Sequence, residues 1–351
     1  MSCEQNLIEQ LQSAMADGTP LVIQGGGSKA FYGRHCEGRP CLVGEHRGVI
    51  DYTPAELVIS ARAGTPLADL EAVLAREEQM LAFEPPHFGT TATLGGTVAC
   101  GLSGPRRPYT GAARDFVLGV RCINGKGEIL RLGGQVMKNV AGYDLSRLLT
   151  GSLGTLAVLL DIHLKVLPRP ETDITLQQSC TAGEAVLRCN RWAGQPLPLS
   201  GACHVDGRLF LRLSGSAQGV AAAAEAIGGD PHHEGADFWQ ALREQQLPFF
   251  QDGTPLWRLS VPAATDSLDL DGEQLLDWGG AQRWLKSHAA PERIRDITAA
   301  CGGHATLYRH GDRNGAVFHP LPPGMLALQQ RLKRSFDPAG ILNPGRIYAE
   351  L

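Results

Sequence analysis

The chain has 351 residues, of which 43% are hydrophobic and 19% charged, and this suits about two globular domains with a buried core. Its 36 acidic residues outnumber its 32 basic ones, and no dense Lys/Arg cluster is present, which excludes the broad positive surface of a nucleic-acid-binding protein. The 9 scattered cysteines predict reduced thiols and exclude both a disulfide framework and an iron–sulfur cluster held by this chain alone.

The N-terminal residues lack the basic start and apolar run of a signal peptide. No stretch approaches the roughly 20 apolar residues that span a bilayer. We therefore expect a cytoplasmic chain without a direct membrane span. Apolar residues at helical spacing predict a helix over 4–16. Cys36 and Cys41 are a close cysteine pair, but no second pair completes a metal site, so we expect no metal.

A glycine-rich loop follows the first predicted strand. The string Gly25-x-Gly27-x-x-Ala30, with Glu45 further on, fits the dinucleotide fingerprint of a Rossmann fold. That fold needs a long helix directly after the glycines, whereas residues 31–38 contain two more glycines. The other interpretations are a tight surface turn and a loop whose consecutive N–H groups bind an anion such as a pyrophosphate. We favour the anion-binding loop.

Short strands at 41–43 and 57–59 and a helix at 66–78, capped by Thr65, follow in the sequence. They predict a first α+β lobe over about 1–84. A second lobe, about 85–170, contains predicted strands and a short helix. Its strands are expected at 116–123, 128–132 and 158–168, its helix at 145–149, and a turn at 124–127 joins the first two strands.

The stretch from Thr91 to Pro105 is rich in glycine and hydroxyl residues and carries no charge. Backbone N–H groups and small side chains can contact a bulky anionic group closely. The residues expected to contact a pyrophosphate or a ribityl chain are Thr91, Gly95, Gly96, Thr97, Ser103 and Gly104. Arg107 is expected to neutralise a phosphate.

Four motifs of this half resemble those of known flavoproteins. They are Phe83-Glu84-Pro85-Pro86, Gly104-Pro105-Arg106-Arg107-Pro108, the run from Gly134 to Asp144, and Gly151-Ser152-Leu153-Gly154-Thr155-Leu156. They are similar to the FAD-binding domain of the vanillyl-alcohol oxidase and p-cresol methylhydroxylase superfamily, and more narrowly to the smaller FAD-binding subunit of bacterial glycolate oxidases. The resemblance implies an α+β fold with a two-lobed, p-cresol methylhydroxylase-type FAD-binding domain over 1–170 and FAD between the lobes.

The resemblance also implies particular FAD contacts. The pyrophosphate would lie on the main chain of Gly25, Gly26, Gly27 and Ser28, with Lys29 also expected to contact the cofactor. An adenine needs an apolar slot with backbone edges, and the segment with Gly154, Thr155 and Val158 fits that need. Many relatives attach the flavin covalently through a histidine or cysteine of this loop. Because this chain has Ser28 and Lys29 there, we expect non-covalent FAD. Lys138 and Tyr143 lie in the segment that flanks the cofactor in the family.

Residues 171–320 alternate strand-like and helical segments in a βαββα order, which predicts a small antiparallel α+β cap domain. In the superfamily the cap determines the substrate, so this region is expected to contact the substrate or a partner. A C-terminal segment, 321–351, contains a helix and the run Phe336 to Arg346, which resembles the ending of related flavin oxidases. It would return to the FAD domain, with Asn343 near the flavin.

The sequence identifies no catalytic residue with a clear motif. Full-length relatives carry a His-Gly-Asp-Gly-Asn-x-His string, which His310 and the residues after it match only with gaps. His310 is therefore a weak candidate for a base, and surface decoration is the alternative. Arg258 and Arg309 are weak candidates for binding a substrate carboxylate, and structural salt bridges are the alternative.

The resemblance implies the FAD-binding subunit of a glycolate oxidase, also called glycolate dehydrogenase. Such a complex oxidises glycolate and related 2-hydroxy acids to 2-oxo acids, with a larger FAD-bearing subunit and an iron–sulfur subunit as partners. Two alternatives stay open at this point: a stand-alone FAD-dependent D-2-hydroxyacid dehydrogenase, and a scaffold subunit that has lost FAD.

Overall fold

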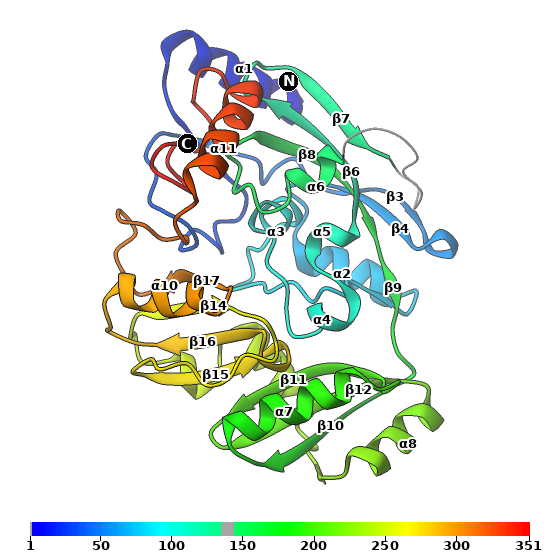
Figure 1. The fold of residues 1–351 in the computed structure, drawn as a ribbon. Helices are drawn as coiled ribbons and strands as arrows, with labels where there is room; N and C mark the ends of the chain where they lie inside the picture. The colour runs from blue at the N-terminus through cyan, green and yellow to red at the C-terminus, as the bar shows by residue number, and fades with distance from the viewer. Residues whose placement is uncertain (1, 135–143) are drawn as a thin grey trace. The chain divides into compact units, whose positions relative to one another are not determined.

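The computed structural model describes residues 2–134 and 144–351. The chain divides into two compact units, each built from non-contiguous segments. Unit 1 comprises Met1–Leu102, Ala112–Pro168 and Arg313–Leu351, and unit 2 comprises Ser103–Gly111 and Arg169–Asp312. The predicted α+β fold is confirmed, because each unit combines an antiparallel sheet with helices (Figure 1).

Unit 1 begins with the predicted N-terminal helix. The Ser2 side chain accepts a hydrogen bond from the Gln5 N–H at the start of α1 (Cys3–Asp17), and Gly18 ends the helix at φ 67°. Its buried face is Leu7, Leu11 and Ala14. The other helices of unit 1 are α2 (Leu67–Ala75), α3 (Leu94–Cys100), α5 (Ala113–Phe116), α6 (Leu145–Leu148) and α11 (Pro323–Phe336).

The sheets of unit 1 comprise a parallel pair and two antiparallel sheets. The parallel pair is β1 (Leu21–Gln24) with β2 (Arg39–Leu42). The main sheet has the order β3-β4-β8-β6-β7, from β3 (Val49–Thr53), β4 (Val58–Arg62), β8 (Ala157–Lys165), β6 (Val117–Asn124) and β7 (Ile129–Gly133). A small pair joins β5 (Gln79–Met80) to β9 (Leu167–Pro168).

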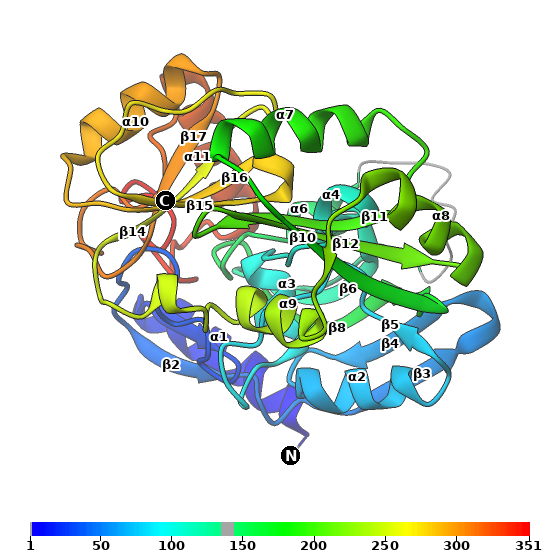
Figure 2. The same cartoon turned by 90° about the horizontal axis from the view of Figure 1, so that it is seen from below.

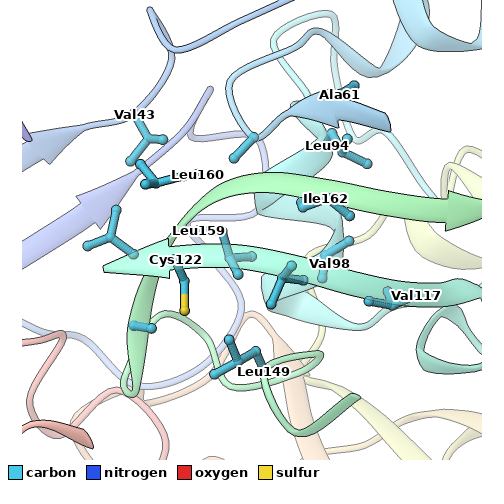
Figure 3. Close-up of a cluster of buried hydrophobic side chains, with 14 of the residues drawn as sticks. Val43, Ala61, Leu94, Val98, Val117, Cys122, Leu149, Leu159, Leu160 and Ile162 are labelled. Atoms are coloured by element: carbon cyan, nitrogen blue, oxygen red, sulfur yellow. The ribbon is translucent and has the colours of Figure 1, made fainter. Parts of the chain in front are cut away.

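A continuous apolar core holds unit 1 together. Figure 3 shows its centre, where Leu94 and Val98 of α3, Ile162 of β8 and Val117 of β6 gather among other aliphatic side chains. Leu94, Val98 and Ile162 are fully buried, and burying such a side chain contributes roughly 1.5–3 kcal/mol. The core therefore packs α3 against the main sheet.

Two details of unit 1 differ from the sequence predictions. Thr65 does not cap α2, since its hydroxyl donates to the Gly48 carbonyl and accepts from the Gly48 N–H. The middle of the glycine-rich stretch, for which no helix was expected, forms α3. Thr93 begins that helix, and its hydroxyl accepts a hydrogen bond from the Gly96 N–H. Tertiary packing of Leu94 and Val98 thus overrides the low helix propensity of Gly95 and Gly96.

Unit 2 is built on an 8-stranded antiparallel sheet of order β13-β10-β12-β11-β15-β16-β14-β17. The strands are β10 (Thr172–Ser179), β11 (Leu199–Val205), β12 (Arg208–Gly215), β13 (Asp230–Pro231), β14 (Leu256–Ser260), β15 (Glu273–Asp277), β16 (Gln282–Lys286) and β17 (His304–Arg309). The helices are α4 (Arg107–Thr110), α7 (Ala182–Ala193), α8 (Ala217–Ile227), α9 (Gly235–Arg243) and α10 (Pro291–Ala300), with 3-10 turns η2 (Pro248–Phe250) and η3 (Trp278–Gly280).

The helices of unit 2 cover both faces of its sheet. Cys189 and Trp192 of α7 pack with Leu209, whereas Trp239 of α9 donates its indole N–H to the Thr175 hydroxyl. Figure 2 shows α7 and α9 on opposite sides of β10, β11 and β12. Along β14 and β17, α10 buries Ile294 against the sheet (Figure 1).

Candidate functional site

A cavity within unit 1 lies where its glycine-rich segments meet. Its lining comes from the loop after β1, from α3, from the start of β8 and from the C-terminal segment. The volume of the cavity, including the open space at its entrance, is about 930 Å³. Ligand-binding clefts commonly measure roughly 300–1,000 Å³. The lining residues are Val22, Ile23, Gln24, Gly25, Gly26, Gly27, Ser28, Lys29, Ala30, Cys36, Val43, Ala63, Thr93, Gly95, Gly96, Ala99, Cys100, Leu153, Gly154, Ala157, Leu159, Asn343 and Arg346.

The glycine loop lies so close to the segment before α3 that no side chain fits between them. A Cβ on Gly26 would lie 1.4 Å from the Thr91 carbonyl oxygen, and one on Gly25 would lie 2.3 Å from Thr93 Oγ1. Gly27 adopts φ 73°, a left-handed conformation that favours glycine. These three glycines therefore bring main chain, rather than side chains, to the edge of the cavity.

Two cationic side chains line the cavity, and no Asp or Glu is among its lining residues. Lys29 is 7% exposed, and its Nζ lies 3.5 Å from Ser28 Oγ and 3.3 Å from the His87 carbonyl oxygen. Arg346 donates to the carbonyls of Ala30, Tyr32 and Arg34, so it also fastens the C-terminal segment to the loop. The resulting charge favours an anionic ligand.

The C-terminal segment contributes Asn343, which is 4% exposed. Its Oδ1 accepts a hydrogen bond from the Ile23 N–H at 2.8 Å, and its Nδ2 donates to the Leu153 carbonyl at 2.6 Å. A Cβ on Gly154 would lie 2.7 Å from this Nδ2. Asn343 thus joins β1 to the segment before β8 at the wall of the cavity.

The structure brings most of the predicted cofactor residues together at this cavity. Those that line it are Gly25, Gly26, Gly27, Ser28, Lys29, Gly95, Gly96, Gly154 and Asn343. Thr91, Thr97, Thr155 and Val158 belong to unit 1 but not to the lining. Thr97 is fully buried and its hydroxyl has no hydrogen-bond partner among the described residues, Thr155 donates to the Ser152 carbonyl, and Val158 lies in the core.

Three predicted contacts belong to unit 2. Ser103, Gly104 and Arg107 lie in its short segment 103–111, and the Arg107 guanidinium carbon is 4.4 Å from the centre of the Trp278 ring. Their contact with a phosphate stays a prediction. Lys138 and Tyr143 lie outside the described residues.

The sequence reasoning missed Cys36, Cys100 and Arg346 as lining residues. Burial raises the pKa of Cys100 to about 11, so this thiol stays protonated at neutral pH. Arg346 ends the C-terminal motif that was expected to return to the FAD domain, and a positive charge in that motif was the signal that could have identified it.

The weak catalytic candidates lie in unit 2. His310 is exposed at φ 60°, and Arg309 donates to Gln245 Oε1 at 2.7 Å. Arg258 lies between Trp284 and Thr306 in the sheet register, with its guanidinium 5.8 Å from the Tyr308 ring centre. Across residues 2–134 and 144–351, no group of three or more His, Cys, Asp or Glu side chains could hold a metal ion.

The cavity's neutral glycine walls and positive charge fit a large ligand that carries a diphosphate. Comparison with known proteins names that ligand. Residues 2–133 match the model of the FAD binding domain, and residues 275–347 match that of the C-terminal domain of FAD linked oxidases. The chain is 53% identical over 347 residues to glycolate oxidase subunit GlcE of Escherichia coli (strain K12), covering 99% of this chain and 98% of that protein.

The chain belongs to the FAD-linked oxidase family. It is an FAD-dependent oxidoreductase by descent, and the residues around the cavity fit that cofactor. Glycolate oxidase subunit GlcD of Bacillus subtilis (strain 168) is 34% identical over 161 residues, or 45% of this chain and 34% of that one. An alkyldihydroxyacetonephosphate synthase structure shares the fold, with a TM-score of 0.69 at 15% identity over 97% of this chain and 74% of that one. Together with the two family matches, this likeness confirms the predicted fold class.

The described part of the chain has no helix long and apolar enough to cross a membrane.

Proposed function

We propose that this FAD-linked oxidase is the FAD-binding subunit of a glycolate oxidase complex that oxidises glycolate and related 2-hydroxy acids to 2-oxo acids. The observation that carries the proposal is the 53% identity with glycolate oxidase subunit GlcE, which extends over almost the whole of both chains. The cavity supports it, since its glycine loop and its two cations suit the pyrophosphate of FAD.

In this proposal the chain binds FAD non-covalently and works with partner subunits. FAD, when bound, supplies the acceptor for the hydride that leaves the hydroxyl-bearing carbon of the substrate. The residues that line the cavity would hold this cofactor: main-chain groups of Gly25, Gly26 and Gly27 would lie against it, and Lys29 and Arg346 would balance its negative charge. A larger FAD-bearing subunit and an iron–sulfur subunit complete the complex, and the chain works in the cytoplasm.

Arg258 and Arg309 are the cap residues that we expect to contact a substrate carboxylate, since a planar guanidinium matches a carboxylate with two hydrogen bonds. The Arg258 guanidinium lies 5.8 Å from the centre of the Tyr308 ring, and that of Arg309 donates to Gln245 Oε1. His310, which is exposed, is the candidate for a base.

An absorption spectrum of the purified chain, followed by anaerobic addition of glycolate, tests the proposed function. We expect a flavin spectrum, release of the flavin by acid precipitation, and bleaching by glycolate only when the chain is co-purified with its partner subunits. Bleaching of the isolated chain would instead identify a stand-alone dehydrogenase. A chain that is colourless and stays so after FAD is added would contradict FAD binding and identify a scaffold.

A further inference from the structure

The connection between β1 and β2 continues beyond the glycines into residues 30–36, which we call the post-glycine loop. Its first and last residues line the cavity of unit 1. Gly33, near its centre, is buried and adopts φ 86°. A Cβ there would lie 2.9 Å from Leu153 Cδ1 and 3.0 Å from the Arg346 carbonyl oxygen. The post-glycine loop therefore packs closely against two other segments that line the cavity.

The post-glycine loop and the C-terminal segment hold each other through two arginines. Arg34 donates its N–H to the Arg346 carbonyl at 2.8 Å and its Nε to the Gly345 carbonyl at 3.0 Å. The Arg346 guanidinium donates in return to the Arg34 carbonyl at 3.0 Å. It also donates to the carbonyls of Ala30 and Tyr32. Main-chain carbonyls thus accept the guanidinium hydrogen bonds on both sides.

Arg313 is a third arginine on the same loop. Its Nε donates to the Gly33 carbonyl at 2.8 Å, and its guanidinium also donates to the Arg34 carbonyl at 3.3 Å. Its own carbonyl accepts the His35 N–H at 3.0 Å. Arg313 therefore binds three consecutive residues of the post-glycine loop, although it is not itself among the residues that line the cavity.

The place of Arg313 in the sequence is informative. The string His-Gly-Asp-Gly-Asn-x-His of full-length relatives has a glycine where this chain has Arg313, between Asp312 and Asn314. A glycine has no side chain that could reach the loop. Asp312 ends the last segment of unit 2, and Arg313 begins the last segment of unit 1. The residue that departs from the string thus belongs to the unit that contains the cavity.

The surroundings of Arg313 suit a fixed guanidinium. Burial, followed by the positive charge of Arg346, lowers the pKa of Arg313. A guanidinium nevertheless stays charged at neutral pH, and its rigid fork can reach two acceptors at once. Hydrogen bonds from a charged donor are stronger than those between neutral groups. The carbonyls of Gly33 and Arg34 are therefore held by a charge-assisted fork.

We infer that Arg313 is a positioning residue for FAD binding, because it fixes the post-glycine loop and with it one wall of the cavity. Without its guanidinium, the Gly33 carbonyl loses this donor, and the Arg34 carbonyl keeps only that of Arg346. The contacts that carry the inference all lie within unit 1. The inference rests on the proposed function in taking FAD as the occupant of the cavity.

Two measurements on the same variants of the full chain test this inference. Hydrogen–deuterium exchange of the FAD-free chain, read on peptides that cover residues 30–36, reports on the loop, and quenching of flavin fluorescence gives the FAD dissociation constant. In Arg313→Met we expect both the exchange rate and the dissociation constant to rise about tenfold, the effect of losing about one charge-assisted hydrogen bond. Arg313→Lys keeps the charge but not the fork, and both should rise about threefold.

Arg62→Met is the matched control. Arg62 is exposed in unit 1, its guanidinium donates to the Arg47 carbonyl at 3.3 Å, and it is not among the residues that line the cavity. The substitution removes the same kind of hydrogen bond from outside the post-glycine loop. Exchange in residues 30–36 and the FAD dissociation constant should both equal those of the wild type.

Three results would overturn the inference. One is wild-type exchange in residues 30–36 of Arg313→Met; should that variant fail to fold, wild-type exchange in Arg313→Lys decides equally. Another is faster exchange with the FAD affinity of the wild type, which would separate the loop from the cofactor. The third is an equal loss in Arg62→Met, which would mean a general weakening of unit 1.

A wild-type chain that binds no FAD gives a different outcome. It would overturn the proposed function and this inference with it, whereas each of the three results above overturns the inference and leaves the proposed function standing.

Discussion

Replacing Gly26 with alanine should lower the affinity for FAD by about 100-fold, equivalent to about 2.7 kcal/mol. The added Cβ would lie 1.4 Å from the Thr91 carbonyl oxygen and 2.5 Å from its carbonyl carbon, so the glycine loop has to move away from the segment before α3. Main-chain atoms cannot rotate aside as a side chain can, and the movement reshapes the cavity that both segments line. A titration followed by flavin fluorescence measures the loss.

Gly324→Ala is the control for this substitution. Gly324 lies in the first turn of α11 in the same unit, and a Cβ there would meet nothing within 4 Å. Alanine should leave the affinity for FAD unchanged and stabilise the helix by at most about 1 kcal/mol. Tight FAD binding by Gly26→Ala would show that the loop does not form the wall of the cofactor site.

Replacing Lys333 with methionine should lower the free energy of unfolding of unit 1 by about 3–5 kcal/mol, the range for breaking a buried ion pair. Lys333 and Asp337 are 6% and 1% exposed, and their Nζ and Oδ2 atoms lie 2.6 Å apart. Lys333 also donates to the carbonyls of Thr155 and Leu342, and burial lowers its pKa. When the ammonium group is removed, the Asp337 carboxylate and the carbonyls of Thr155 and Leu342 stay buried but lose this hydrogen-bond donor.

The ion pair also sets the position of Asn343. Asp337 accepts hydrogen bonds from the N–H groups of Ile341 and Leu342, so the turn that leads to Asn343 depends on its carboxylate. Lys333→Met should therefore weaken FAD binding as well as stability. The midpoint of urea unfolding and the FAD dissociation constant measure the two effects separately.

Arg334→Gln serves as the control, because Arg334 is exposed on the same turn of α11. It should leave the unfolding midpoint nearly unchanged, as surface substitutions usually do. The Lys333→Met/Asp337→Leu double variant should regain part of the stability, since no isolated charge stays buried. An unfolding midpoint for Lys333→Met equal to that of Arg334→Gln would contradict the structural importance of the pair.

Local patterns predicted much of the architecture. The apolar spacing of Leu7 and Leu11 predicted the N-terminal helix. The turn sequence Asn124-Gly125-Lys126-Gly127 predicted the hairpin of β6 and β7, in which Gly127 adopts φ 75°. The glycine loop was predicted to bind the cofactor because closely spaced glycines after a strand let consecutive main-chain N–H groups approach an anion, and because the loop resembles that of related flavoproteins. These features depend on neighbours in the sequence, so a single sequence contains them.

Other features depend on contacts between distant segments. The strand β16 was not predicted, because Gln282, Arg283 and Lys286 suggest an exposed segment although all three are buried. Arg283 is accommodated by backbone carbonyls, including that of Asp266 at 2.7 Å, which no local pattern shows. The assignment of Gly104 and Arg107 to unit 2 likewise depends on Trp278, which lies far away in the sequence.

The most direct test of the FAD site is protection of Cys36 from a maleimide, followed by mass spectrometry. Cys36 lines the cavity and is partly exposed, and Cys301, partly exposed in unit 2, is the internal reference. FAD should slow labelling of Cys36 and leave Cys301 unchanged, with half-maximal protection at the dissociation constant found by fluorescence. The opposite result is that flavin fluorescence is quenched in the titration while Cys36 is labelled as fast with FAD as without it. In that case the cofactor binds elsewhere, and the assignment of this cavity is wrong.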